Sequence, residues 1–232
     1  MSASGRVSDR QPDWRVVVFA RVPRLGRVKT RLAQVLGAEA ALDAYRALLG
    51  HTLQTVAAFR AAIHATQAQV RSLHTELCLD GEDTNHECKR LSETFGFESS
   101  QQGAGDLGAR MAEALQRSLL RGEQVVLIGS DCPALGPGDL AQAFCLLDER
   151  DTVLSPTEDG GYALIGAARQ LAPVFDAMPW STPGVLAETL RRLEVCGIPY
   201  ALLRELWDVD TATDWQRWRA DLGAGQCAQG SL

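Results

Sequence analysis

Residues 15 to 31 read RVVVFARVPRLGRVKTR, an apolar run of strand length followed at once by a segment rich in cations. The run from Val16 to Ala20 has the length and β-branched content of a buried strand. The next eleven positions, 21 to 31, carry five Arg or Lys residues. In an open α/β sheet, ligands bind beyond the carboxyl ends of the strands. A functional loop is therefore expected at this junction.

The rest of the sequence alternates strand-length apolar runs with stretches of helical periodicity. This alternation is typical of right-handed βαβ units that build a mostly parallel sheet. The expected strands are 15–20, 75–79, 124–129, 152–155, 162–166 and 200–206. The expected helices are 39–59, 106–120, 139–149, 183–196 and 211 to about 222. The predicted fold is an α/β three-layer α/β/α sandwich with a mixed, mainly parallel sheet.

Length and composition indicate one globular domain. The chain has 232 residues, of which 46% are hydrophobic and 22% charged, as in ordinary globular proteins. Residues 1–13 are polar and the last ten are small and unpatterned. We expect flexible tails at 1–13 and 223–232 around a single domain at 14–222.

Charge and cysteine usage narrow the classes of partner and location. The net charge of -6 argues against nucleic acid as a partner, because phosphate backbones are bound through clustered cations. No apolar stretch approaches the roughly 20 residues that a membrane span requires, and no secretory h-region is visible. The six cysteines show no CxxC pair, which favours reduced thiols. A cytoplasmic protein without a membrane partner is expected.

The cationic loop after the first strand is a candidate phosphate site. Lys29 and Arg31 can donate charge-assisted hydrogen bonds to a polyphosphate, and a turn with proline and glycine can direct backbone N–H groups to it. The competing interpretation is a solvated charged loop. The residues assigned to this site are Ala20, Arg21, Pro23, Gly26, Lys29 and Arg31.

Two acidic segments after strands are candidate metal ligands. Ser130 and Asp131 directly follow the run VVLIG, and Asp208 and Asp210 follow the last expected strand. Carboxylates at strand ends suit Mg²⁺ or Mn²⁺ that also holds a substrate phosphate. A turn or helix-cap role is the alternative. Thr211 with Asp214 three residues later fits a helix cap, which makes that part of the cluster structural.

The segment from Asp159 to Tyr162 and the pair Trp180–Ser181 are candidate substrate contacts. Gly160 and Gly161 allow close approach of a ligand to the backbone, although Asp-Gly is also a strong hairpin signal. Trp180 can stack on a base or sugar, but a core position is at least as common for Trp.

The segment Gly103 to Gly108 forms a GxGxxG pattern. The dinucleotide fingerprint requires an apolar strand that runs into the first glycine. The preceding residues, 98–102, read ESSQQ, which makes a poor central strand, so a dehydrogenase is not expected. We expect Asp106 to open a helix whose Arg110 faces the site. No GxSxG elbow is present, which leaves serine hydrolase chemistry without support.

Taken together, these segments resemble a bacterial family of GT-A-fold proteins labelled glycosyltransferase-like and associated with radical-SAM or arsenosugar pathways. The resemblance spans residues 15 to 218 through FARVPRLGRVKTRLA, QGAGDLGARM, VVLIGSDCPAL, SPTEDGGYALIG, PWST and DVDT. More distantly, the KTRL loop and the DVDTxxD ending are similar to those of small nucleotidyltransferases of the molybdenum-cofactor and deazaflavin-cofactor pathways. In that wider group, positions matching Asp131 and Asp210 hold magnesium, and those matching Arg21, Lys29 and Arg31 hold the triphosphate.

The resemblance and the residues together imply a nucleotide-utilising transferase. The expected catalytic residues are Asp131, Lys29 and Arg31, with Mg²⁺ or Mn²⁺ as cofactor. In glycosyl transfer, the donor is a nucleotide sugar and the acceptor a small molecule. In nucleotidyl transfer, an NTP loses pyrophosphate as its NMP moves to a phosphorylated acceptor. A third possibility is a non-catalytic nucleotide-binding protein, against which the retained Asp131 and Asp210 count.

Overall fold

The computed structural model describes residues 11–65, 71–171 and 173–229. Within these ranges, seven strands form one sheet in the order β3-β2-β1-β4-β6-β5-β7. The strands are β1 (Asp13–Arg21), β2 (Leu73–Asp80), β3 (Glu98–Gln101), β4 (Glu123–Ile128), β5 (Thr152–Pro156), β6 (Tyr162–Ala167) and β7 (Tyr200–Leu202). β6 pairs antiparallel with β4 and β5, and the other strand pairs are parallel. The sheet is mixed and mainly parallel, as predicted.

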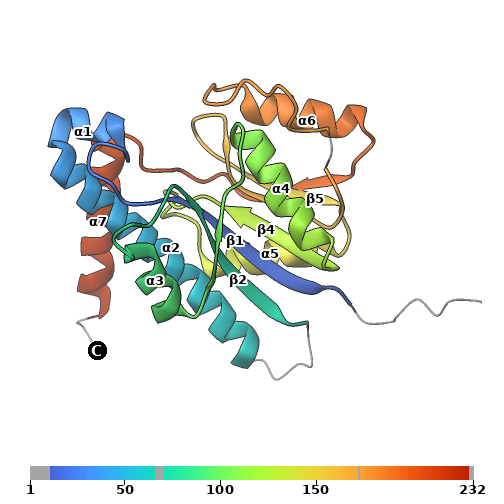
Figure 1. Cartoon of the computed structure of the whole chain (residues 1–232), viewed down its shortest axis with the longest axis horizontal. Helices are drawn as coiled ribbons and strands as arrows, with labels where there is room; N and C mark the ends of the chain where they lie inside the picture. The colour runs from blue at the N-terminus through green and yellow to red at the C-terminus, as the bar shows by residue number, and fades with distance from the viewer. Residues whose placement is uncertain (1–10, 66–70, 172, 230–232) are drawn as a thin grey trace, which may run out of the picture.

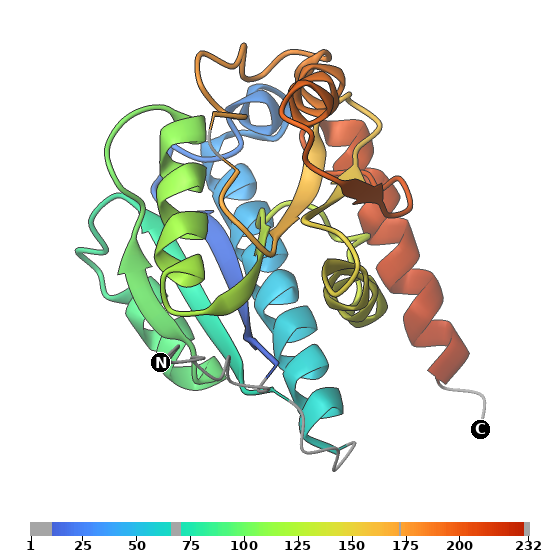
Figure 2. The same cartoon turned by 90° about the vertical axis from the view of Figure 1, so that its right-hand side faces the viewer.

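Helices cover both faces of this sheet (Figures 1 and 2). The helices are α1 (Thr30–Leu36), α2 (Ala38–Ala65), α3 (Glu87–Phe95), α4 (Leu107–Leu119), α5 (Pro137–Leu147), α6 (Val185–Val195) and α7 (Ala212–Gln229). On one face, Phe59 of α2 and Phe144 of α5 pack with Trp14 of β1 in one hydrophobic cluster. On the other face, Leu115 of α4 and Leu193 of α6 belong to a second cluster. None of the described helices has both the length and the hydropathy that a membrane span requires.

β1 lies at the centre of the sheet, between β2 and β4. Its side chains alternate between the two clusters: Val16 and Val18 belong to the α2 and α5 side, and Val17 and Phe19 to the α4 and α6 side. Because both faces are covered, the strand has no solvated side and its sequence is a continuous apolar run. This is why VVVFA indicated the fold.

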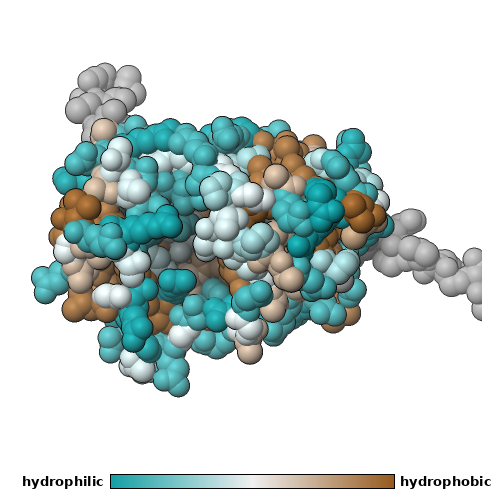
Figure 3. All heavy atoms as spheres, turned by 90° about the horizontal axis from the view of Figure 1, so that it is seen from above, coloured by the Kyte–Doolittle hydropathy of each residue, from teal (hydrophilic) through white to brown (hydrophobic). Residues whose placement is uncertain are grey.

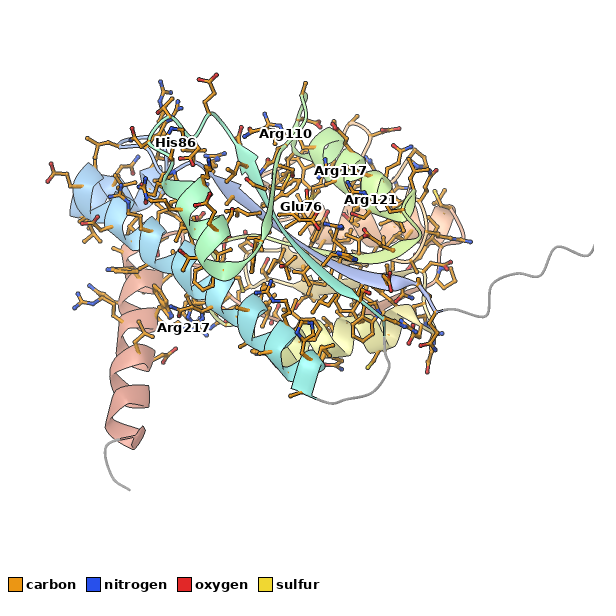
Figure 4. The ribbon with its side chains drawn as sticks, turned by 60° about the horizontal axis from the view of Figure 1, so that its bottom comes forward. Glu76, His86, Arg110, Arg117, Arg121 and Arg217 are labelled. Atoms are coloured by element: carbon orange, nitrogen blue, oxygen red, sulfur yellow. The ribbon has the colours of Figure 1, made fainter. Side chains whose placement is uncertain are left out.

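Arg15 interrupts the apolar pattern of β1 with a buried charge. Its Nε donates to Glu123 of β4 at 2.6 Å, and its Nη1 donates to Glu76 of β2 at 3.2 Å and to Glu98 of β3 at 2.8 Å. Arg117 of α4 also bonds Glu76, and the two side chains point toward one another in Figure 4. Acids from three strands thus neutralise a guanidinium inside the sheet layer.

Three short elements were not predicted from the sequence. α1 follows the cationic loop, α3 buries only Cys88 and Ser92, and β3 has the polar sequence ESSQ. β3 is an edge strand that pairs with β2 through its backbone, so it needs no apolar face. The expectation that ESSQQ makes a poor central strand agrees with this position, because β3 lies at the edge of the sheet and is not the central strand that the dinucleotide fingerprint uses.

Several expected boundaries also differ from the structure. β7 ends at Leu202, and of the remaining expected strand residues only Leu206 forms an isolated bridge, with Thr157. The last helix continues to Gln229, past the domain end expected at 222, and β1 begins at Asp13. Residues 1–10 of the expected N-terminal tail lie outside the described residues.

We predict that Arg15→Ala lowers the free energy of unfolding by about 3 to 5 kcal/mol, because it leaves Glu123 buried without its guanidinium partner and removes one of the two guanidinium groups that bond Glu76. Urea unfolding of the purified variant measures this change. The matched control is Arg169→Ala, whose guanidinium is 53% exposed and pairs with Asp151. A surface pair of this kind contributes about 1 kcal/mol or less. Equal losses in the two variants would contradict a stabilising role for the buried network.

Candidate functional site

The carboxyl ends of β1, β2 and β4 border a cavity of about 730 Å³, here called the larger cavity. Because these strands are parallel, the residues that follow them meet at one edge of the sheet. The space-filling view from above shows a hollow in the surface with a largely hydrophilic rim (Figure 3). The charged side chains that line the larger cavity are Arg21, Lys29, Arg31, Asp80, Asp106, Arg110, Asp131 and Asp210.

Among these charged residues, Lys29 lies between the carboxylates of Asp131 and Asp210. Its Nζ donates to Asp131 Oδ2 at 2.9 Å and to Asp210 Oδ1 at 3.2 Å, and its side chain is 6% exposed. Burial alone would lower the pKa of Lys29, but the charges of Asp131 and Asp210 and the hydrogen bonds to them outweigh it, so the pKa lies above its ordinary value. Lys29 is a fixed cation.

The backbone of Lys29 adopts a left-handed conformation, with φ of 45°, at the N-terminal boundary of α1. For a residue with a Cβ this conformation is unfavourable, and it persists where surrounding contacts hold it. The two carboxylates that bind Nζ are such contacts. The turn that ends the cationic loop therefore aims Lys29 inward.

The segment from Trp207 to Asp210 is joined to the end of β4 by hydrogen bonds. The Val209 N–H donates to the Asp131 carbonyl at 2.9 Å, and Cys132 Sγ donates to the Trp207 carbonyl at 3.1 Å. The carboxylate of Asp214 accepts from the Asp210 N–H at 3.2 Å. These bonds bring Asp131 close to Asp210, although the two residues are 79 positions apart in the sequence.

Asp214 also accepts from the Thr211 N–H at 2.7 Å and Thr211 Oγ1 faces the Asp214 N–H at 3.4 Å. The cap that the sequence indicated at the start of α7 is therefore present. The carboxylates of Asp208 and Asp210 take no part in this cap.

Asp131, Asp208 and Asp210 form a group suited to a divalent cation. Each offers one carboxylate oxygen, and the three oxygens lie within 4.8 Å of one another. No described protein group donates a hydrogen bond to the carboxylate of Asp208; its burial, followed by repulsion from Asp131 and nearby acids, raises its pKa to about 7. Carboxylate oxygens are the ligands that Mg²⁺ prefers, and it commonly takes one or two of them together with substrate phosphates, so this group could hold such an ion.

The other cations of the larger cavity are more exposed than Lys29. Arg31 is 71% exposed, and its Nη1 donates to Asp210 at 3.3 Å. Arg110 of α4 pairs with Asp80 at the end of β2, at 3.1 Å, and Arg21 approaches the same carboxylate at 3.8 Å. Because the guanidinium groups of Arg21 and Arg31 are exposed, they have room to turn toward an anion that enters the cavity.

A smaller cavity, of about 310 Å³, adjoins the larger one and shares five lining residues with it: Leu107, Asp131, Trp180, Ser181 and Asp210. The turn between β5 and β6 forms one wall. Asp159 Oδ1 accepts from Thr157 Oγ1 at 2.6 Å and from the Gly161 N–H at 3.0 Å, so this segment is a tight turn, as the alternative interpretation held.

Gly160 joins this turn to the start of α6. Its φ is 85°, and a Cβ there would lie 2.1 Å from the Pro183 carbonyl oxygen. The Leu186 N–H donates to the Gly160 carbonyl at 2.9 Å. Only glycine allows this approach. Gly160 shapes the smaller cavity without lining it.

The structure thus brings most of the predicted site residues to the two cavities, but not all. Pro23 and Gly26 line neither cavity and instead shape the cationic loop. Asp106 lines the larger cavity but also caps α4, since its carboxylate accepts from the Ala109 N–H at 2.9 Å. Cys132 is buried and its Sγ donates to the Trp207 carbonyl; burial raises the pKa of the thiol to about 12, which disfavours the thiolate form that a nucleophile needs.

Tyr45 and Asp80 are among the residues of the larger cavity that were not predicted from the sequence. Tyr45 of α2 is buried; its hydroxyl donates to the Arg21 carbonyl and accepts from the Arg21 N–H, each at 2.8 Å, and approaches Ser130 Oγ at 3.4 Å. It holds the end of β1 beside the end of β4. Asp80 follows a predicted strand directly and could have been found by the same rule as Asp131.

A protein-family model matches residues 62–182, which is just over half of the 232-residue chain. The family is described as an uncharacterized protein conserved in bacteria, DUF2064. The chain belongs to this family. Asp131, Asp159 and Trp180 lie within the matched range, whereas Lys29 and Asp210 lie outside it. No match to a curated protein was found.

Solved structures share the whole fold. A candidate nucleotide-diphospho-sugar transferase from Desulfovibrio desulfuricans G20 is 27% identical, with a TM-score of 0.73, over 87% of this chain and 84% of that chain. A CMP:2-keto-3-deoxy-manno-octonic acid synthetase complexed with CTP is 14% identical, with a TM-score of 0.56, over 92% and 99% of the two chains. The 4-diphosphocytidyl-2C-methyl-D-erythritol synthase of Anaerococcus prevotii DSM 20548 is 11% identical, with a TM-score of 0.58, over 91% of this chain and 96% of that chain. The fold is that of nucleotide-diphospho-sugar transferase-like proteins.

We predict that Asp131→Asn and Asp210→Asn each weaken Mn²⁺ binding by about tenfold or more, because each replaces a charged oxygen ligand with a neutral one. Electron paramagnetic resonance of free Mn²⁺ measures the affinity. Asp43→Asn is the control, since Asp43 lies on α2, is 76% exposed and pairs with Arg46. The metal assignment is wrong if all three variants bind Mn²⁺ as the parent protein does.

Proposed function

We propose that this protein is a metal-dependent transferase that uses a nucleotide-activated donor, with a nucleotide sugar as that donor. The observation that carries the proposal is the arrangement of two cavities that share Asp131 and Asp210. The larger cavity contains the cations, and the smaller cavity lies next to it, with Asp131 and Asp210 lining both. Group transfer requires two substrates to be held next to each other in a fixed orientation.

The donor's phosphates would lie in the larger cavity. Lys29 is buried and fixed there, while Arg21 and Arg31 are exposed and can close on the phosphates. A divalent cation held by Asp131, Asp208 and Asp210 would supply charge neutralisation at the leaving phosphate. The similarity in fold to a candidate nucleotide-diphospho-sugar transferase at 27% identity supports this donor class.

Nucleotidyl transfer from an NTP is the second candidate. It is favoured by the five cations at positions 21 to 31, because a triphosphate carries more negative charge than the diphosphate of a nucleotide sugar. A nucleotide-binding protein without catalytic activity would need no metal ligands, so the close approach of the three carboxylates counts against that third possibility.

A cytoplasmic location is part of the proposal. The five cysteines in the described part of the chain, Cys78, Cys88, Cys132, Cys145 and Cys196, are all free. Unpaired thiols, two of them exposed, suit a reducing compartment.

We predict that the protein binds a nucleotide sugar in the presence of Mg²⁺, and that Lys29→Ala weakens this binding by about 1.5 to 3 kcal/mol through loss of a charge-assisted contact. A thermal-shift panel of nucleoside diphosphates, NTPs and nucleotide sugars, with and without Mg²⁺, identifies the donor, because a ligand of the native state raises apparent stability. Calorimetry of the variant then measures the loss.

Arg27→Ala is the matched control, since Arg27 lies exposed in the same loop but lines neither cavity. Its effect should stay within about 0.5 kcal/mol. Absence of binding to every nucleotide in the panel would refute the proposed function. If Lys29→Ala impairs an NTP far more than the matching nucleotide sugar, nucleotidyl transfer becomes the better assignment.

A further inference from the structure

Asp208 is held in the candidate metal group through its neighbours in the chain. Within the described ranges, no protein group donates a hydrogen bond to its carboxylate, and Asp131, Asp159 and Asp210 repel it. Lys29 bonds Asp131 and Asp210 but makes no hydrogen bond to Asp208. Like charges at short range are unfavourable unless other contacts hold them in place. The position of Asp208 therefore depends on the contacts of the residues beside it.

Both neighbours of Asp208 are tied to the chain that follows β4. On one side, the Val209 N–H donates to the Asp131 carbonyl at 2.9 Å. On the other side, the Trp207 carbonyl accepts from Cys132 Sγ at 3.1 Å. The Trp207 side chain is half-buried and packs in a small cluster with Val209. Its indole ring is thus the handle by which another side chain can fix this segment.

Arg217 of α7 contacts this indole ring and the turn between β5 and β6 at the same time. Its guanidinium carbon lies 4.1 Å from the centroid of the Trp207 ring, which is a favourable cation–π distance. Its Nη1 donates to both carboxylate oxygens of Glu158, at 3.0 and 3.2 Å, and its Nη2 donates to Oε1 at 3.2 Å. Glu158 directly precedes Asp159, and its N–H donates to the Leu206 carbonyl at 3.1 Å. One guanidinium thus joins the segments that carry two acids of the smaller cavity.

α7 provides a fixed base for Arg217, which Figure 4 labels beside that helix. The Asp214 carboxylate accepts from the Asp210 N–H at 3.2 Å. Trp218 is buried in one cluster with Leu48 of α2. Arg217 itself lines neither cavity. Any effect of its contacts on the site must therefore pass through the residues that it touches.

We infer that Arg217 is a positioning residue: by joining Trp207 to Glu158 it holds Asp208 in the metal group, beside Asp159. The inference rests on the proposed function, because it concerns the metal group of the same transferase. It goes further by making metal affinity depend on a residue of α7 that lies outside both cavities.

The charge of Arg217 alone would act in the opposite direction. A guanidinium near a metal site repels the metal ion, so removal of the charge by itself tightens metal binding. Removal of the positioning contacts lets Asp208 move away from the other acids, and this weakens metal binding. The sign of the change in affinity therefore separates the two effects.

The test measures the Mn²⁺ affinity of Arg217→Met in the full chain, by electron paramagnetic resonance of free Mn²⁺ below the onset of unfolding. Methionine keeps a long side chain but loses the charge and the hydrogen bonds. The affinity should fall about threefold to tenfold, because an exposed ion pair and an exposed cation–π contact each contribute modestly. Unchanged or tighter Mn²⁺ binding would overturn the inference. So would a lower Tm with unchanged affinity, since Arg217 would then only stabilise the docking of α7.

Arg219→Met is the matched control. Arg219 lies exposed on the same helix and lines neither cavity, and its replacement removes the same charge. Its Mn²⁺ affinity should stay within about twofold of the parent value. A loss equal to that of Arg217→Met would contradict a role for the specific contacts of Arg217.

A double-mutant cycle with Glu158→Gln tests the link through the turn. Glutamine removes the charge of the pair and weakens the contact with Arg217. If Arg217 acts through Glu158, Arg217→Met should cost less Mn²⁺ affinity in the Glu158→Gln background than in the parent protein. Fully additive losses would overturn this link.

The same titrations distinguish a failure of this inference from a failure of the proposed function. If the parent protein does not bind Mn²⁺, the metal assignment is wrong and the inference is overturned with it. If the parent protein binds Mn²⁺ and Arg217→Met binds it as tightly, the metal group stands and only the positioning role is wrong.

Discussion

One ammonium group joins three distant parts of the chain. Lys29 bonds Asp131 and Asp210, which lie 102 and 181 positions further along. A buried charge is costly unless oppositely charged groups surround it, so each partner requires the others to be in place. Two local features bring these side chains together: the left-handed backbone of Lys29, and the hydrogen bond from the Val209 N–H to the Asp131 carbonyl. The two cavities have a common border because this contact forms.

The sheet makes that contact possible. β1 and β4 are adjacent and parallel, so the loop after one strand and the carboxylate after the other emerge at the same edge. Tyr45 reinforces the geometry from α2, since its hydroxyl closes two bonds with the backbone of Arg21 and approaches Ser130. Stability and site geometry are therefore coupled at the strand ends, while the buried Arg15 network stabilises the opposite end of the same strands.

The sequence predicted those parts of the site that obey a local rule. Asp131 and Lys29 follow apolar runs, and a strand end is recognisable from its own residues. Tyr45 sits in the middle of a long helix and reaches the site only through tertiary packing, for which a single sequence carries no signal. β3 was missed because backbone pairing at the edge of a sheet can hold a polar segment. The turn at Asp159 was left ambiguous because a hairpin and a ligand wall use the same residues.

β6 is the only described strand that runs against the others, and it is joined to β5 by a hairpin. A hairpin can change in length or sequence at its tip while its two strands keep their register. The tip carries Asp159 and Gly161 into the smaller cavity, whereas the residues that border the larger cavity come from other loops. Evolution could therefore diversify the smaller cavity in related proteins by varying residues of this tip other than Gly160, and leave the cationic cavity unaltered.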